Sequence, residues 1–196
     1  MTTEKKKTNK FIKDIGAVFN PVFYIFGLVG IASAIIVCGF QWAAVLMAIF
    51  LVFLAACAAA DIENGIVPDL MVVLIAALAI IRILINELTF QNILSYILGV
   101  LVLSVPMLLV ALIIKNGFGG GDIKMMAAAG LFLGLDKTII AGFIAFLIAG
   151  IYGALLLIQK GKGPKTKIRL APFLALGCAF SALFGDVLLL VLGINI

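Results

Sequence analysis

Seven apolar stretches fill most of this 196-residue chain, and only short polar breaks separate them. They run approximately over residues 21–40, 42–60, 70–85, 91–114, 123–135, 138–158 and 171–193. A bilayer core of about 30 Å needs roughly 20 apolar residues for each helical crossing, and a helix satisfies its backbone hydrogen bonds within the segment. With 65% hydrophobic and 12% charged residues, the chain is predicted to be an all-α, polytopic membrane bundle of about six to seven transmembrane segments.

The basic residues predict how this bundle is oriented. If the N-terminus is cytoplasmic, twelve of the fourteen Lys and Arg residues fall on the cytoplasmic side, and the exceptions are Arg82 and Lys137. Short cytoplasmic loops are enriched in positive charge, so this orientation is favoured in the cell (inner or plasma) membrane. We expect a basic cytoplasmic tail over residues 1–20, an uncleaved first helix, and a single membrane-embedded domain over residues 21–196.

Three features inside the spans need separate interpretation. Segment 123–135 is short for a crossing and is expected to cross while packed inside protein, because otherwise the late basic loop would fall outside. Arg82 is expected to snorkel or to pair locally near Asn86 and Glu87. For Asp186 two possibilities stay open, a last span that ends near Gly185 or a carboxylate at depth.

Small residues inside the spans, such as Gly130, Gly134 and Gly150, are expected to let helices approach closely.

The residue types that are missing exclude several classes of chemistry. The chain has no histidine, which excludes Ser-His and Cys-His nucleophiles and histidine-ligated zinc. Cys38, Cys57 and Cys178 are isolated and form no C-x-x-C pair, so neither a metal nor a cofactor is predicted. The basic stretch QKGKGPKTKIR is interpreted as a solvated loop near anionic membrane lipid, and no nucleic-acid partner is expected.

Two aspartates are predicted to share one end of the bundle. Asp61 ends the second span, and Asp122 precedes the fifth, with two crossings between them. An even number of crossings returns the chain to the same face, so both carboxylates are expected at the cytoplasmic end at similar depth. Two neighbouring carboxyls cannot both ionise cheaply, which gives one acid and one base around a water molecule. Such a pair hydrolyses an amide, and the sequence leaves open which aspartate is the acid.

The residues around these aspartates are interpreted as supporting the site. Gly117, Gly119, Gly120 and Gly121 in KNGFGGGDIK are expected to give backbone freedom in φ and to let another backbone approach closely. The alternative is a plain helix-breaking connector.

Three charged neighbours each have two interpretations. Lys124 either favours the charged form of Asp122 or snorkels to the interface. Glu63 and Asp69 are hypothesised to receive a cationic peptide segment, whereas the alternatives are a solvated side chain and a helix start after Pro68.

Three short motifs carry a family resemblance. DIENGIVPD at 61–69 resembles the D-I-x-x-x-x-[IL]-P-[DN] box, and GGGDIK at 119–124 resembles the G-x-G-D-x-K box, of the type IV prepilin peptidases and their preflagellin relatives. APFLALG at 171–177 looks like a third box of that family. The resemblance implies a GxGD-type membrane aspartic protease in which Asp61 and Asp122 form the catalytic pair. It also implies prepilin-like or preflagellin-like substrates, whose short basic leader is cut at the cytoplasmic face.

One departure from the family concerns methylation. Bifunctional members also methylate the new N-terminus and carry an insertion with paired C-x-x-C motifs after the first span. Here little more than GFQW joins the first two spans, and no C-x-x-C exists. The resemblance is therefore to the short, peptidase-only type, and S-adenosylmethionine binding is not carried over.

Two alternatives use the same aspartates. Presenilin-like intramembrane proteases share the G-x-G-D loop, but they usually have tyrosine before the first aspartate, where this chain has Ala60. A small ion-coupled or proton-coupled transporter would bind its ion at the two carboxylates, near the middle of the membrane.

Overall fold

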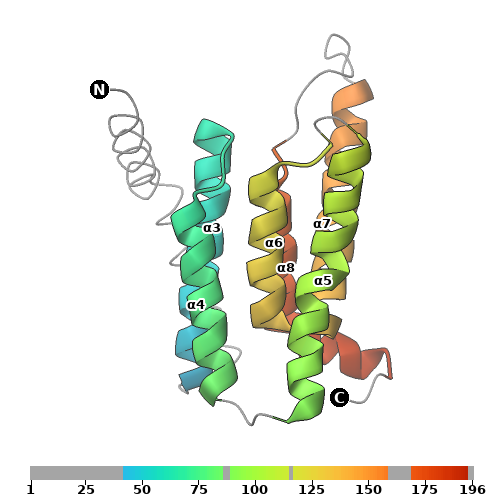
Figure 1. Ribbon diagram of the computed structural model, residues 1–196. Helices are drawn as coiled ribbons and strands as arrows, with labels where there is room; N and C mark the ends of the chain where they lie inside the picture. Colours follow the sequence, from blue (N-terminus) through green and yellow to red (C-terminus); the bar gives the residue numbers. More distant parts are fainter. Residues whose placement is uncertain (1–41, 86–88, 115–116, 159–168, 194–196) are drawn as a thin grey trace, which may run out of the picture.

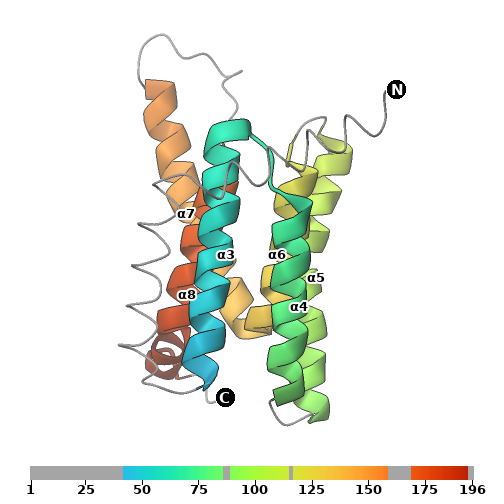
Figure 2. The ribbon, with the colours of Figure 1, turned by 90° about the vertical axis from the view of Figure 1, so that its left-hand side faces the viewer.

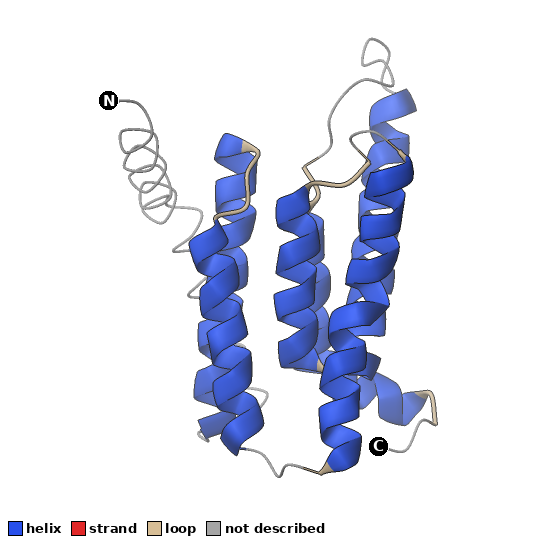
Figure 3. Ribbon diagram, viewed as in Figure 1, coloured by secondary structure: helices blue, strands red, loops and turns tan. Residues whose placement is uncertain are grey.

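The computed structural model describes residues 42–85, 89–114, 117–158 and 169–193. All regular secondary structure in these ranges is helical (Figures 1 and 3). The helices are α3 (Trp42–Asn64), α4 (Asp69–Ile85), α5 (Phe90–Ile113), α6 (Gly120–Leu133), α7 (Leu135–Ile158) and α8 (Ala171–Val191). The predicted all-α class is confirmed for this part of the chain. The predicted tail and first span, residues 1–40, lie outside the described residues.

Four of these helices are long and apolar enough to cross a membrane. They are α3, α5, α7 over Leu135–Leu156, and α8. Helices α4 and α6 are shorter, with 17 and 14 residues. The chain is thus a multi-pass membrane protein, while the total of six to seven spans and the cytoplasmic N-terminus stay predictions.

Consecutive helices run in opposite directions, which brings distant parts of the chain together at each end. In Figure 1, α3 and α5 end, and α4, α6 and α8 begin, at the upper end of the bundle. Helix α3 packs against α8, and α4 packs against α6 (Figure 2). The residues near 61, 122 and 171 therefore meet at one end, although they are far apart in the sequence.

Helix α6 is short but lies among other helices. At about 1.5 Å per residue, its 14 residues span roughly 21 Å. It packs against α4, α5, α7 and α8, and half of its residues are buried: Met125, Met126, Ala128, Ala129, Gly130, Phe132 and Leu133. This matches the expected short segment packed inside protein, and α7 begins directly after it because Gly134 adopts a φ of 81°.

Glycines allow close helix contacts at specific positions. A Cβ on Gly130 would overlap the backbone of Gly99 on α5, and a Cβ on Gly177 would overlap the backbone of Ala141 on α7. The expectation for Gly130 is therefore confirmed. The expectation for Gly150 is wrong, because no atom lies within 4 Å of a Cβ built there.

Arg82 and Asp186 each have a partner on a neighbouring helix. The Arg82 guanidinium on α4 donates a hydrogen bond to the Phe132 carbonyl oxygen on α6, whereas Asn86 and Glu87, its expected neighbours, lie outside the described residues. Helix α8 does not end at Gly185 but continues through Asp186 to Val191. The Asp186 side chain is 68% exposed and forms an ion pair with Lys137 at 2.7 Å.

Candidate active site

Asp61 lies in the last turn of α3 and is held by the first residue of α8. Asp61 is only 6% exposed, and its Oδ2 accepts a hydrogen bond from the backbone N–H of Ala171 at 3.3 Å. Helix α3 ends here because Gly65 adopts a left-handed φ of 66° and donates its N–H to the Asp61 carbonyl oxygen at 2.9 Å. The glycine turn therefore fixes the helix end, and α8 fixes the carboxylate.

A four-residue connection leads from α3 into α4 beside this carboxylate. Val67 and Pro68 are buried in it, and the Pro68 carbonyl oxygen accepts the N–H groups of Met71 and Val72 at 3.1 and 3.3 Å. Asp69 is the first residue of α4, where a carboxylate interacts favourably with the positive helix end. This explains locally why Pro68 and Asp69 start the helix.

Asp122 approaches from the first turn of α6, outside the four helices of spanning length. Its Oδ1 is buried and has no hydrogen-bond partner among the described residues. Burial raises the pKa of this carboxyl to about 6, the negative charge of Asp61 adds to the shift, and a backbone hydrogen bond with Gly119 opposes it. The Asp122 carboxyl therefore holds a proton more readily than a solvated aspartate.

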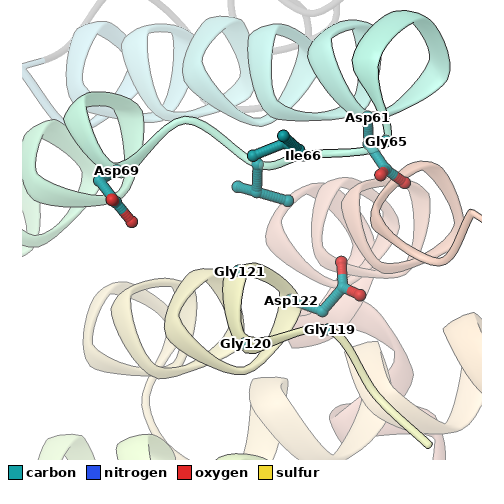
Figure 4. A pocket seen from close by; sticks show the side chains of 9 residues that line it. Asp61, Gly65, Ile66, Asp69, Gly119, Gly120, Gly121 and Asp122 are labelled. Carbon is teal, nitrogen blue, oxygen red and sulfur yellow. The ribbon is translucent and has the colours of Figure 1, made fainter. Parts of the chain in front are cut away.

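The two aspartates line one pocket of about 270 Å³. In Figure 4 their carboxyl groups point toward the same space, Asp61 from α3 and Asp122 from α6. The residues that line the pocket are Asp61, Gly65, Ile66, Val67, Asp69, Gly119, Gly120, Gly121 and Asp122. These residues include three carboxylates and no basic side chain, so the space suits a water molecule and a neutral or cationic peptide segment.

Glycines in the loop before α6 and in its first turn let other atoms come close to the backbone, and none of these glycines has a positive φ. A Cβ on Gly121 would lie 2.9 Å from Cβ of Val67, and one on Gly119 would lie 2.9 Å from Oδ2 of Asp122. A Cβ on Gly120 would meet no atom within 4 Å. None of Gly117, Gly119, Gly120 and Gly121 has a positive φ in this structure, so the expected backbone freedom at these positions stays a prediction. Close approach is supported for Gly119 and Gly121, and also for Gly117, where a Cβ would lie 3.2 Å from the carbonyl oxygen of Ile114.

Of the charged residues predicted to support the site, Lys124 and Asp69 pair with each other and Glu63 lies apart from the pocket. The Lys124 Nζ lies 3.3 Å from Oδ1 of Asp69, with both side chains more than half exposed. Lys124 thus pairs with Asp69 rather than extending alone to the interface, and neither sequence interpretation anticipated this ion pair. Glu63 is exposed and does not line the pocket.

The backbone N–H of Ala171 is the site group that sequence reasoning missed. It contacts Asp61 from 110 residues further along the chain. The signal that could have found it is the APFLALG motif itself, because its proline fits the start of a helix and helix starts have free N–H groups.

Comparisons with known proteins show which sequences this chain resembles. The type IV leader peptidase family model matches residues 48–154, a range that contains both aspartates. A Bacillus subtilis protein named prepilin leader peptidase/N-methyltransferase is 31% identical over 141 residues, covering 70% of this chain and 55% of that protein. A Xanthomonas campestris protein of the same name is 36% identical over 62 residues, covering 32% of this chain and 22% of that protein. The chain thus spans about half the length, or less, of these relatives. No solved structure matches the chain.

Proposed function

Because this chain belongs to the type IV leader peptidase family, we propose that it is a membrane aspartic endopeptidase that removes the short basic leader from prepilin-like or preflagellin-like precursors. The observation that carries the proposal is the shared pocket of Asp61 and Asp122, two carboxylates 61 residues apart in the sequence. Both residues lie in the segment that the family model matches, which supports their role as the catalytic pair.

The surroundings of the two carboxyls favour Asp61 as the base and Asp122 as the acid. The Ala171 N–H at the start of α8 donates to Asp61, and a donor at a helix N-terminus stabilises negative charge. Oδ1 of Asp122 is buried without a described partner, and a protonated oxygen carries less charge into such a site. The resting proton is therefore assigned to Asp122.

In the proposed reaction, the Asp61 carboxylate takes a proton from water while the water oxygen attacks the scissile carbonyl carbon. The Asp122 carboxyl donates its proton to the carbonyl oxygen, which gives a neutral tetrahedral intermediate. When the C–N bond breaks, Asp61 gives its proton to the leaving nitrogen and Asp122 recovers a proton from the hydroxyl group. Both carboxyls return to their starting states, and the reaction uses no cofactor.

The location of the site supports cleavage at the cytoplasmic face of the cell membrane. Lys124 and Arg169 are exposed at the end of the bundle that holds the pocket, and positive charge marks cytoplasmic ends. We place residues 1–20 in a basic cytoplasmic tail and residues 21–196 in one membrane-embedded peptidase domain. Because GFQW replaces the cysteine-containing insertion of bifunctional members, the proposed activity includes no N-methylation.

The direct test is cleavage by the purified full chain in lipid vesicles. The substrate is a prepilin-like protein with a basic leader that ends in glycine and an apolar helix after it. Intact-mass spectrometry is expected to show loss of the leader at a single bond. If the chain cuts neither this substrate nor a preflagellin-like one while inserted and folded, the peptidase proposal fails.

A charge-reversal prediction tests whether Glu63 and Asp69 contact the leader. Asp69 lines the pocket, and Lys124 now occupies the position that a substrate cation would take beside it. Glu63→Lys combined with Asp69→Lys is expected to lower kcat/KM for a basic leader about fivefold or more, because exposed ion pairs contribute about 0.2–1 kcal/mol each and reversal adds repulsion.

The control for this prediction is a matched pair of substrates and a distant charge reversal. In the double charge reversal, kcat/KM for a substrate with a neutral leader should fall much less than kcat/KM for the basic one. Asp136→Lys at the start of α7 should leave kcat/KM unchanged for both substrates. An equal loss with basic and neutral leaders would show that Glu63 and Asp69 do not contact the leader's charges.

A further inference from the structure

Three side chains from three helices form a stack near the end of α6 that is away from the pocket. The rings of Phe50 on α3 and Phe132 on α6 lie 4.1 Å apart between centroids and are nearly parallel, at 11°. The Arg82 guanidinium of α4 lies 4.7 Å from the centroid of the Phe132 ring. Phe50 and Phe132 are 0% and 1% exposed. We call these three residues the aromatic stack.

The stack lies at nearly the same distance from each aspartate along that aspartate's own helix. Asp61 follows Phe50 by eleven residues on α3, and Asp122 precedes Phe132 by ten residues on α6. At about 1.5 Å per residue, each aspartate lies roughly 15–17 Å from the stack. Because α3 and α6 run in opposite directions (Figure 1), a stack that aligns Phe50 with Phe132 also places Asp61 and Asp122 at one depth.

Helices α3 and α6 have little else that sets their register directly. Within the described bundle, α3 packs mainly against α4 and α8, whereas α6 packs mainly against α4 and α5 and less closely against α7 and α8. A slide of α6 along α4 would carry Asp122 away from Asp61 without separating α3 from its own neighbours. The direct contact of Phe50 with Phe132 opposes that slide.

Arg82 fixes the same end of α6 from α4. It donates to the Phe132 carbonyl oxygen in the last turn of α6, where helix carbonyls lack partners within the helix and a cation is favoured. Its guanidinium also covers the ring face, which adds a cation–π contact. A single side chain thus holds both the backbone and the ring of Phe132.

We propose that the aromatic stack of Phe50, Phe132 and Arg82 is a positioning device that sets the axial register of α3 and α6 and thereby the alignment of Asp61 with Asp122. The inference rests on the proposed two-carboxylate function for its catalytic consequence, but the alignment itself is a property of the bundle. A displacement of about 1 Å at a catalytic group can cost about a hundredfold in rate, so small changes in register should be visible in kcat.

The kinetic test uses Arg82→Met, which keeps a long apolar side chain but removes the donor and the cation, and Arg82→Lys, which restores both in part. Arg82→Met is expected to lower kcat about tenfold or more with KM changed less than about twofold, and Arg82→Lys to recover part of kcat. Phe132→Leu removes the aromatic ring but keeps an apolar side chain, and it should also lower kcat by a larger factor than it raises KM.

The matched control is Lys137→Met, which removes a cation paired with Asp186 at the same end of the bundle, between α7 and α8. It should leave kcat within about twofold when compared at equal folded fraction. If Arg82→Met behaves like Lys137→Met, or if it raises KM and leaves kcat unchanged, the stack is only structural and the inference is overturned.

A second measurement decides the alignment without any peptidase activity. Asp61→Cys and Asp122→Cys are combined in a chain whose three native cysteines are replaced by alanine, and a short bifunctional thiol-reactive reagent, a bis-methanethiosulfonate, is added. Rapid cross-linking is expected, and Arg82→Met should slow it severalfold while Lys137→Met should not. Unchanged cross-linking in Arg82→Met overturns the inference. If the chain with both aspartates intact cuts no substrate, rapid cross-linking that Arg82→Met slows would still support the alignment, so the two failures are distinguishable.

Discussion

Asp61→Asn and Asp122→Asn, made separately, are each expected to lower leader cleavage by at least about 10²–10⁴-fold, the range that a positioned acid or base contributes. Asparagine keeps the size of the side chain but can neither take the proton from water nor supply one to the carbonyl oxygen. In Asp61→Asn, the amide oxygen can still accept the N–H of Ala171, so the fold should be retained. The measurement is single-turnover cleavage in vesicles, with membrane insertion checked for each variant.

The double variant sharpens this result. If the two carboxyls act as one unit, removing both should cost about as much as removing one, because effects within a catalytic unit are not additive. Asp136→Asn provides the control, since it removes a carboxylate from the first turn of α7, at the opposite end from the pocket. Retained cleavage in either Asp61→Asn or Asp122→Asn would contradict the two-carboxylate mechanism.

Gly121→Ala is expected to lower kcat about tenfold to a hundredfold and also to lower the melting temperature. The added Cβ would lie 2.9 Å from Cβ of Val67 and 3.5 Å from its backbone nitrogen. Val67 is 6% exposed and precedes a proline, so it cannot move aside easily. Overpacking of this kind costs about 1–3 kcal/mol, and relief by movement of α6 would displace Asp122. Thermal unfolding and steady-state kinetics in the same detergent measure both effects.

Gly120→Ala is the matched comparison, because the same methyl group one residue earlier meets no protein atom within 4 Å. Its melting temperature should equal or exceed that of the parent, since alanine is favoured over glycine in a helix. Gly120 lines the pocket, so a methyl group there should raise KM if the substrate passes over it. Equal melting temperatures and equal kcat for the two alanine variants would refute the account of Gly121.

Much of the fold could be predicted because a chain inside a lipid bilayer must form apolar helices long enough to cross it. Apolar runs bounded by polar breaks predicted α3, α4, α5, α7 and α8 within a few residues of their observed ends. The end of α3 was less predictable, since the helix runs on to Asn64 through the polar residues after Asp61. Close helix contacts were harder still, because Gly130 and Gly150 look alike in sequence and only the first meets another backbone.

The carboxylate pair of the site could be predicted because topology alone returns residues 61 and 122 to one end. The sequence does not predict contacts that depend on how far a side chain extends or on backbone atoms. The sequence predicts that Lys124 either favours the charged form of Asp122 or snorkels to the interface. In the structure, Lys124 forms an ion pair with Asp69 on another helix. The Ala171 side chain gives no information about what its amide binds, so the only sequence signal for this N–H is the helix start that Pro172 indicates.

The hydrogen bond from Ala171 to Asp61 also sets the order in which the site can be finished during synthesis. The ribosome makes Asp61 early, and its donor follows 110 residues later at the start of the last described helix. A nascent chain that has inserted α3 to α7 already holds both aspartates but lacks the group that fixes the first. The contacts of Asp61 are therefore complete only when α8 joins the bundle, and under the proposed function the base gains its N–H donor as the last step of assembly.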